Sequence, residues 1–189
     1  MKNLFKHLAL VTKHRFMVFK FCLMCGIGWQ GFIHDLSKYS ITELRESLKY
    51  FNGSHSPLAD AKIDQGYSLA WLHHKGRNKH HHEYWYDYTA PDATPLMPFK
   101  YVLEMICDNI SAAKTYNGDN YTDICPLEYW LKVRSISRVN PRIDRILIEV
   151  YTLLDEKGLK YTLNKERIRE IYDRNAALEI DDDDDKDDD

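Results

Sequence analysis

The sequence lacks the alternation of apolar and polar residues that marks a β-sheet, and it has no internal repeat. It also lacks an uninterrupted apolar run long enough to cross a bilayer, because Lys20 divides the stretch 16–29. Lys2 and Lys6 are not followed by the apolar segment and small-residue cleavage site of a signal peptide. These absences predict an all-α, cytoplasmic protein that does not contact a membrane.

Charged residues make up an ordinary share of the sequence, 29%, but the chain has little net charge apart from one segment. The formal net charge is -3, but residues 181–189 alone contribute -7 through eight aspartates and one lysine, so the rest of the chain carries +4. Such a mildly basic surface suits a small anionic substrate, whereas a nucleic-acid interface would need a denser stripe of Lys and Arg. We therefore expect one domain over residues 1–178 and a disordered acidic tail over residues 179–189.

Cysteine is used little. Cys22 and Cys25 form a CxxC motif, but no second CxxC is present to complete a zinc site. The motif lies inside the apolar stretch 16–27, so both residues are expected to be reduced thiols in the core.

Apolar residues recur at a helical spacing along most of the chain. Ser40 followed by Glu43 is typical of a helix N-cap, and Pro126 and Pro141 suit first helical turns. The pattern predicts an all-α bundle, with a short segment at 29–36 that contains a His-Asp pair. The helices are expected over 4–25, 40–51, 59–74, 98–115, 126–139, 141–156 and 165–178.

Histidine is abundant, with nine residues, of which five lie between His73 and His82 and one directly precedes Asp35. Imidazole and carboxylate groups are the ligands that suit Zn, Fe, Mn, Co or Ni. Taken singly, His14 would suit a helix core or surface, and the run 80–82 would suit a solvated loop. Asp108 is harder to explain, because it interrupts an apolar helix where an unpaired carboxylate is costly to bury.

In chain order these residues resemble the HD-domain superfamily of metal-dependent phosphohydrolases. The stretch 31–38 (GFIHDLSK) resembles the superfamily's His-Asp box, and 106–112 (ICDNISA) resembles its final Asp on a helix. The stretch 78–85 is similar to an HD-like family of bacteria and phages that has not been characterised. The resemblance covers residues 7–120 and implies an HD-domain-like helical bundle.

The resemblance also implies roles for individual residues. A first metal would be held by His14, His34, Asp35 and Asp108, and a second by His74, His80 or His81, with Asp35 bridging the two. His74 is preferred to His73 because it shares a helix face with Ala70 and Trp71, and His82 is expected outside the ligand set. Lys38 would contact a substrate phosphate, and Glu104 would orient Asp108 or act as an acid.

The function that follows is hydrolysis of a nucleotide or a related small phosphoester by metal-activated water, with one or two divalent transition-metal ions as cofactors. Two alternatives keep the site and change its use. One is a di-iron oxygenase of the same superfamily, and the other is a protein that binds a metal or a nucleotide without catalysis.

Overall fold

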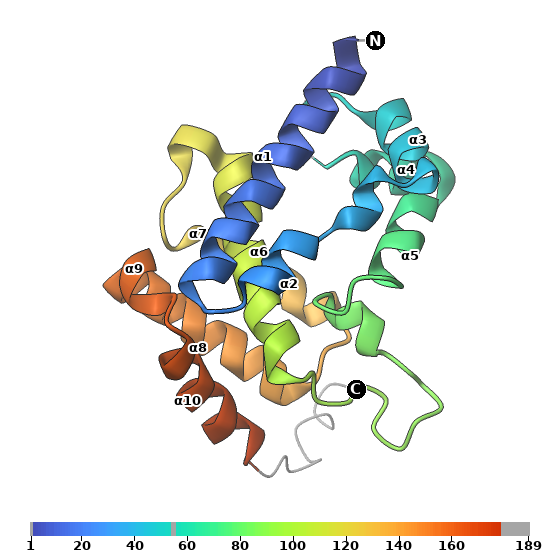
Figure 1. The fold of residues 1–189 in the computed structure, drawn as a ribbon. Helices are drawn as coiled ribbons and strands as arrows, with labels where there is room; N and C mark the ends of the chain where they lie inside the picture. The colour runs from blue at the N-terminus through green and yellow to red at the C-terminus, as the bar shows by residue number, and fades with distance from the viewer. Residues whose placement is uncertain (1, 54–55, 179–189) are drawn as a thin grey trace.

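The computed structural model describes residues 2–53 and 56–178, and within these ranges every regular element is a helix and none is a strand. This confirms the predicted all-α bundle (Figure 1). Four 3-10 helices join the α-helices, namely η1 (Leu36–Tyr39), η2 (His82–Trp85), η3 (Gly118–Asn120) and η4 (Arg134–Ile136). The α-helices are α1 (Lys2–Met24), α2 (Gly28–Ile33), α3 (Ile41–Tyr50), α4 (Pro57–Gln65), α5 (Leu69–Lys75), α6 (Phe99–Asn117), α7 (Cys125–Val133), α8 (Pro141–Lys157), α9 (Leu159–Thr162) and α10 (Lys165–Ala176).

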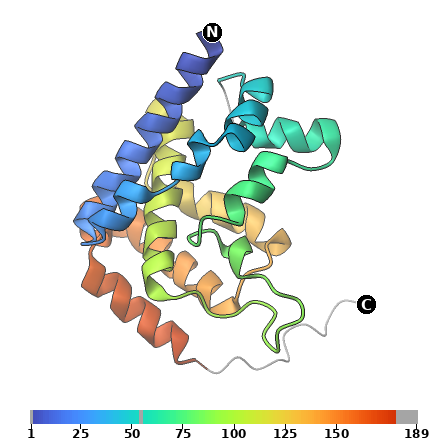
Figure 2. The same ribbon diagram turned by 45° about the vertical axis from the view of Figure 1, so that its right-hand side comes forward.

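Helix α6 runs through the middle of the molecule (Figures 1 and 2) and packs against α1, α7 and α10. Val102, Ile106 and Ile110 recur every four residues along one side of α6, and all three are fully buried. The burial of each such side chain stabilises the fold by about 1.5–3 kcal/mol. Because α6 is covered on several sides, the carboxylate of Asp108 also lies inside the protein.

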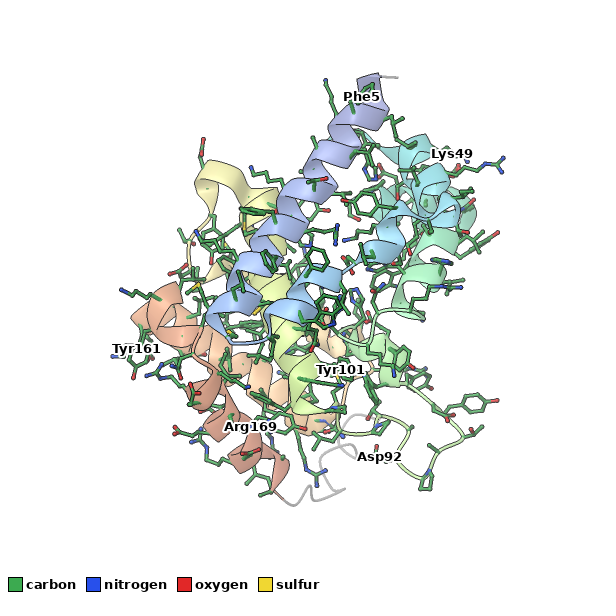
Figure 3. The ribbon with its side chains drawn as sticks, in the orientation of Figure 1. Phe5, Lys49, Asp92, Tyr101, Tyr161 and Arg169 are labelled. Carbon is green, nitrogen blue, oxygen red and sulfur yellow. The ribbon has the colours of Figure 1, made fainter. Side chains whose placement is uncertain are left out.

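The other helices form two groups at opposite ends of the molecule, with α6 between them. The views of Figures 1 and 2 place α3, α4 and α5 at one end, and α8, α9 and α10 at the other. In Figure 3, Lys49 of α3 accordingly lies far from Tyr161 of α9 and Arg169 of α10. The predicted metal ligands lie on α1, α5 and α6 and on the connections next to α2 and α5. No helix in the described part of the chain is both long and apolar enough to span a bilayer.

The prediction of one helix over 59–74 is wrong, because the chain breaks there into α4 and α5. Gly66 follows α4 with a φ of 80°, the left-handed conformation that ends many helices. Ser68 then caps α5, where its side chain accepts a hydrogen bond of 3.0 Å from the Trp71 backbone N–H. The break turns α5 away from α4 and lets it carry His74 inward.

The other boundaries are close to those expected. Ser40 accepts a hydrogen bond from the Glu43 backbone N–H, which confirms the predicted N-cap, and Pro126 and Pro141 lie in the first turns of α7 and α8. Helix α7 ends at Val133 and continues as the 3-10 helix η4, short of the predicted position 139. The short helix α9 was not predicted.

The CxxC thiols lie in the core, as expected. Cys22 and Cys25, at the end of α1, are fully buried free thiols, and the Cys107 thiol of α6 donates a hydrogen bond of 3.9 Å to Cys25 Sγ. These thiols lie in the contact between α1 and α6, where Cys107 directly precedes Asp108.

Helix α2 packs closely on α1 through Gly31. A Cβ atom at Gly31 would lie 2.5 Å from the Cβ of Cys22 and 3.1 Å from the Cα of Phe19. Only a residue without a side chain fits such an approach. The contact matters for function because His34 and Asp35 directly follow α2.

Gly31→Ala is expected to destabilise the protein by about 1–3 kcal/mol, because the added methyl group must push α2 away from the α1 backbone. Gly28→Ala is the matched control, since its Cβ would meet only the movable end of the Leu23 side chain, at 2.6 Å. Urea unfolding followed by circular dichroism would measure both. Equal stability of the two variants would contradict the role given to Gly31.

Candidate metal centre

The His34–Asp35 pair lies in a sharp turn between α2 and η1. His34 is extended, and Asp35 has a φ of 53°, the left-handed conformation that Asp tolerates better than most residues. Arg15 of α1 fixes this turn, because its Nε donates to the His34 carbonyl at 2.7 Å and its Nη2 to the Phe32 carbonyl at 2.9 Å. The turn directs both the His34 and the Asp35 side chain into the interior, where they are buried.

The first predicted ligand group is assembled from three parts of the chain. His14 of α1, His34, Asp35 and Asp108 of α6 present one donor atom each, all within 4.8 Å of one another. His14 Nε2 lies 2.9 Å from Asp108 Oδ1, and His34 Nε2 lies 3.4 Å from the same oxygen. His34 Nε2 also lies 3.3 Å from Asp35 Oδ2. Two imidazoles and two carboxylates thus face one another at distances that a single cation could span.

A second group shares Asp35 with the first. His74 of α5, His80 and His81 present donor atoms that lie within 4.8 Å of one another and of an Asp35 oxygen. His74 Nε2 is 3.3 Å from Asp35 Oδ1, and His80 Nε2 is 3.5 Å from the same atom. One oxygen of Asp35 therefore faces each group, which is the arrangement that a bridging carboxylate requires.

Carboxylates behind the imidazoles orient the rings. Glu104 lies on α6, and its Oε1 is 2.9 Å from His34 Nδ1 and 3.1 Å from His80 Nδ1, while Gln30 donates to its other oxygen. An ionised carboxylate only accepts hydrogen bonds, so each ring donates from Nδ1 and directs Nε2 into its ligand group. Metal-binding histidines usually have this kind of outer partner.

Glu43 of α3 supports the second group in the same way. Its Oε2 is 2.9 Å from His74 Nδ1, and its Oε1 is 2.7 Å from His73 Nδ1. Sequence reasoning missed this role, because Glu43 was interpreted only as part of the α3 cap. Its side chain instead points inward and is buried. The available signal was its place in α3, one turn beyond the His-Asp box.

Several buried polar atoms at the centre have no hydrogen-bond partner within the described part of the chain. They include His34 Nε2, Asp35 Oδ1, His80 Nε2 and His81 Nε2, whereas the other oxygen of Asp35, Oδ2, is ion-paired with Lys38. A buried polar atom left without a partner costs about 1–3 kcal/mol, so such atoms are uncommon in folded proteins. These four atoms lie in the two ligand groups and fit bound cations, which would take up the lone pairs of the oxygen and of the unprotonated imidazole nitrogens. The residues present therefore suit a divalent transition metal bound by nitrogen and oxygen.

The electrostatics of the first group depend on the balance of its charges. Burial opposes ionisation of Asp35, yet the nearby His34 and Lys38 hold the pKa of that carboxyl well below its usual range. Burial likewise opposes a charged His34 ring, but Asp35 and Asp108 hold its pKa well above the usual value. The carboxylates are thus ionised and attract positive charge, and a metal ion that binds His34 would displace a proton from the ring.

The other ligand candidates differ in their protonation. Burial lowers the pKa of His14, and burial together with His80 and His74 holds the pKa of His81 well below its usual value, so both rings are neutral and suited to bind a metal. Burial opposes ionisation of Glu104, but hydrogen bonds from His34 and His80 lower its pKa to about 2. An ionised Glu104 is not a proton donor, and it orients the His34 and His80 rings in place of Asp108, the partner that was predicted for it.

Solvent reaches the centre from one side. The side chains of His34 and Asp35 are at most 1% exposed, those of His14 and Asp108 are 10% and 11% exposed, and that of Lys38 is 29% exposed. The Lys38 ammonium lies 2.6 Å from Asp35 Oδ2. Lys38 therefore stands at the open side, in contact with the shared carboxylate.

All seven predicted metal ligands lie in the two groups, namely His14, His34, Asp35, His74, His80, His81 and Asp108. His73 and His82 lie outside both groups, as expected. His7 also lies outside them. It is buried against Phe51, and its Nδ1 has no hydrogen-bond partner among the described residues. The preference for His74 over His73 thus agrees with the geometry.

A family model for DUF5662, described as a family of unknown function, matches residues 3–153. The chain belongs to this family. The matched region of this DUF5662 protein contains both ligand groups and their outer carboxylates, and it ends within α8. No curated protein and no solved structure matches the chain.

Proposed function

We propose that this protein is a metal-dependent phosphohydrolase, related to the HD-domain superfamily, that acts on a nucleotide or a related small phosphoester. One observation carries the proposal: Asp35 offers one oxygen to each of two ligand groups, with Lys38 in contact with the same carboxylate at the open side. The order His14, His34-Asp35 and Asp108 and the positive charge of the chain body support it.

The reaction breaks the ester P–O bond, transfers the oxygen of water to phosphorus and gives one proton of that water to the leaving oxygen. The residues of the two groups would hold a metal, which would supply a lowered pKa to bound water and positive charge opposite the phosphoryl oxygens. Lys38 lies where the substrate enters, and its ammonium offsets the charge that builds up on those oxygens. Asp35 holds that ammonium in place, and Glu104 keeps the His34 and His80 rings directed inward.

Lys38→Ala is expected to retain the metal and lose turnover by about 10²–10³-fold, the usual effect of removing one group that stabilises transition-state charge. Lys49→Ala is the control, because Lys49 is exposed and, among the described residues, pairs with Tyr50 and Asp64 and not with any residue of the ligand groups. A phosphatase screen over nucleotides with Mn, Co or Ni, combined with metal analysis, would measure both properties. Full turnover by Lys38→Ala would remove its role, and lost metal would make that role structural.

A second candidate is a di-iron oxygenase, which is favoured by one observation: the second group combines three imidazoles with a single carboxylate. Nitrogen-rich sites of this kind suit iron as well as zinc or nickel. Iron analysis and an absorption spectrum of freshly purified protein distinguish the two, because a phosphohydrolase needs no redox-active pair. Binding of a metal or a nucleotide without turnover of any phosphoester would instead support a non-catalytic role.

A further inference from the structure

The first 34 residues contain no Asp or Glu but five cationic residues, Lys2, Lys6, Lys13, Arg15 and Lys20. They form α1, α2 and the turn that leads to His34. Of the lysines among them, Lys6, Lys13 and Lys20 are exposed. One side of the molecule therefore presents helices of a single charge sign, although the chain as a whole is acidic.

The same helices expose large apolar side chains. Phe16 is 68% exposed, Leu23 54%, Trp29 74% and Phe32 57%. Phe16 and Leu23 lie seven residues apart on one face of α1, while Trp29 and Phe32 lie on α2, which packs beside the C-terminal half of α1 (Figures 1 and 2). We call these four residues, with Lys13 and Lys20, the α1–α2 face.

The apolar part of this face is continuous. The rings of Trp29 and Phe32 stack with their centroids 5.7 Å apart. The centroid of the Phe32 ring also lies 6.3 Å from that of Phe19 on α1, so the two helices share one aromatic surface. Phe5, which Figure 3 labels near the outer end of α1, is also exposed, three turns of helix before Phe16. Other exposed residues, such as Ile63 and Ile136, lie on separate elements. A contiguous apolar surface with a charged rim usually marks a binding site.

The charge of the face selects its partner. A symmetric dimer formed through this face would gather Lys13 and Lys20 of both copies at one interface to which α1 and α2 contribute no acidic residue, and unpaired like charges at an interface are unfavourable. An anionic surface avoids this conflict. Exposed Trp, Phe and Leu beside lysines are the composition of helices that lie in the interface of an anionic bilayer.

We propose that the α1–α2 face binds the surface of a membrane rich in anionic lipid, with Trp29, Phe32 and Phe16 inserted among the headgroups. The protein lies on the bilayer and does not cross it. This replaces the expectation of no membrane contact, which followed from the lack of a spanning segment. The proposal does not depend on the phosphohydrolase activity. It places the metal centre on the inner side of α1, about one helix diameter, or roughly 10 Å, from the lipid.

Flotation of the full-length protein with vesicles tests the proposal. Binding is expected to vesicles of phosphatidylcholine with about one-third phosphatidylglycerol and not to pure phosphatidylcholine, and it should weaken as salt rises. Trp29→Ser with Phe32→Ser should lower the partition coefficient at least about tenfold, because two inserted rings are lost. Lys13→Glu with Lys20→Glu should lower it by roughly fivefold or more for each lysine.

Ile63→Ser with Ile136→Ser is the matched control, because these residues are as exposed as Trp29 but lie outside the face, and it should bind like the unchanged protein. Equal binding of the Trp29/Phe32 variant and the unchanged protein would overturn the proposal, as would a lack of binding to anionic vesicles. A dimer in solution that the Trp29/Phe32 change dissociates would also overturn it, since the face would then be an interface between copies.

Discussion

Asp35→Asn is expected to weaken metal binding at both ligand groups, with apparent metal affinity falling by more than about 100-fold, beyond what loss of an outer partner costs. The reason is that Asp35 is the one residue shared by the two ligand groups. Asparagine tolerates the left-handed backbone of residue 35, so this variant loses the charge without added strain. Metal analysis after dialysis would measure the effect.

Two further variants test whether a loss of metal is specific to the proposed ligands. His34→Ala should also lose metal, since His34 Nε2 faces both Asp35 and Asp108. His82→Ala should retain it, because the His82 ring packs against Trp130 and lies outside both groups. Full metal content in both Asp35→Asn and His34→Ala would show that the proposed ligand set is wrong. A general loss of metal in all three variants would indicate that folding, not ligation, was affected.

Glu104→Gln is expected to weaken metal binding by about 10–100-fold while the ligands themselves stay in place. Glu104 holds His34 of the first group and His80 of the second through one oxygen. Glutamine keeps the shape but removes the charge that fixes both rings as Nδ1–H donors. Competition with a chelating dye would measure the affinity, and the absorption spectrum of the cobalt-loaded protein would report changes in ligand geometry.

Glu43→Gln gives a sharper comparison, because Glu43 supports only the second group, through His74. It should weaken one of two binding events, whereas Glu104→Gln should weaken both. Glu149→Gln is the control, since Glu149 lies on α8 and pairs with Arg174 on α10. If Glu104→Gln and Glu149→Gln bind metal equally, the Glu104 carboxylate does not orient the His34 and His80 rings for metal binding.

Much of the centre could be predicted from the sequence because its residues carry their own signal. A carboxylate such as Asp108 in an apolar helix requires a partner, and histidines next to carboxylates suggest what that partner is. The all-α architecture was predictable for a similar reason, because the apolar spacing along α6 and α8 matches a helix and not a strand. The link to the HD-domain superfamily stays a prediction.

The rest depends on contacts between segments that are distant in sequence. Glu43 follows a capping serine, so its local role explained it fully, and only the packing of α3 against α5 shows that its side chain reaches His73 and His74. The break at Gly66 was missed because glycine is tolerated within a helix pattern, and its left-handed backbone is a property of the folded chain. The pairing of Glu104 with two rings likewise requires knowledge of the tertiary structure.

The position of Asp108 on the central helix has a consequence for how the protein reaches its native state. His14 and Asp108 meet only after the first helix has packed against the sixth, with most of the intervening chain already arranged between them. Closing so long a segment costs conformational entropy, which the apolar packing of α1 against α6 offsets. A cation that bound His14 and Asp108 would therefore stabilise an arrangement that apolar packing also favours.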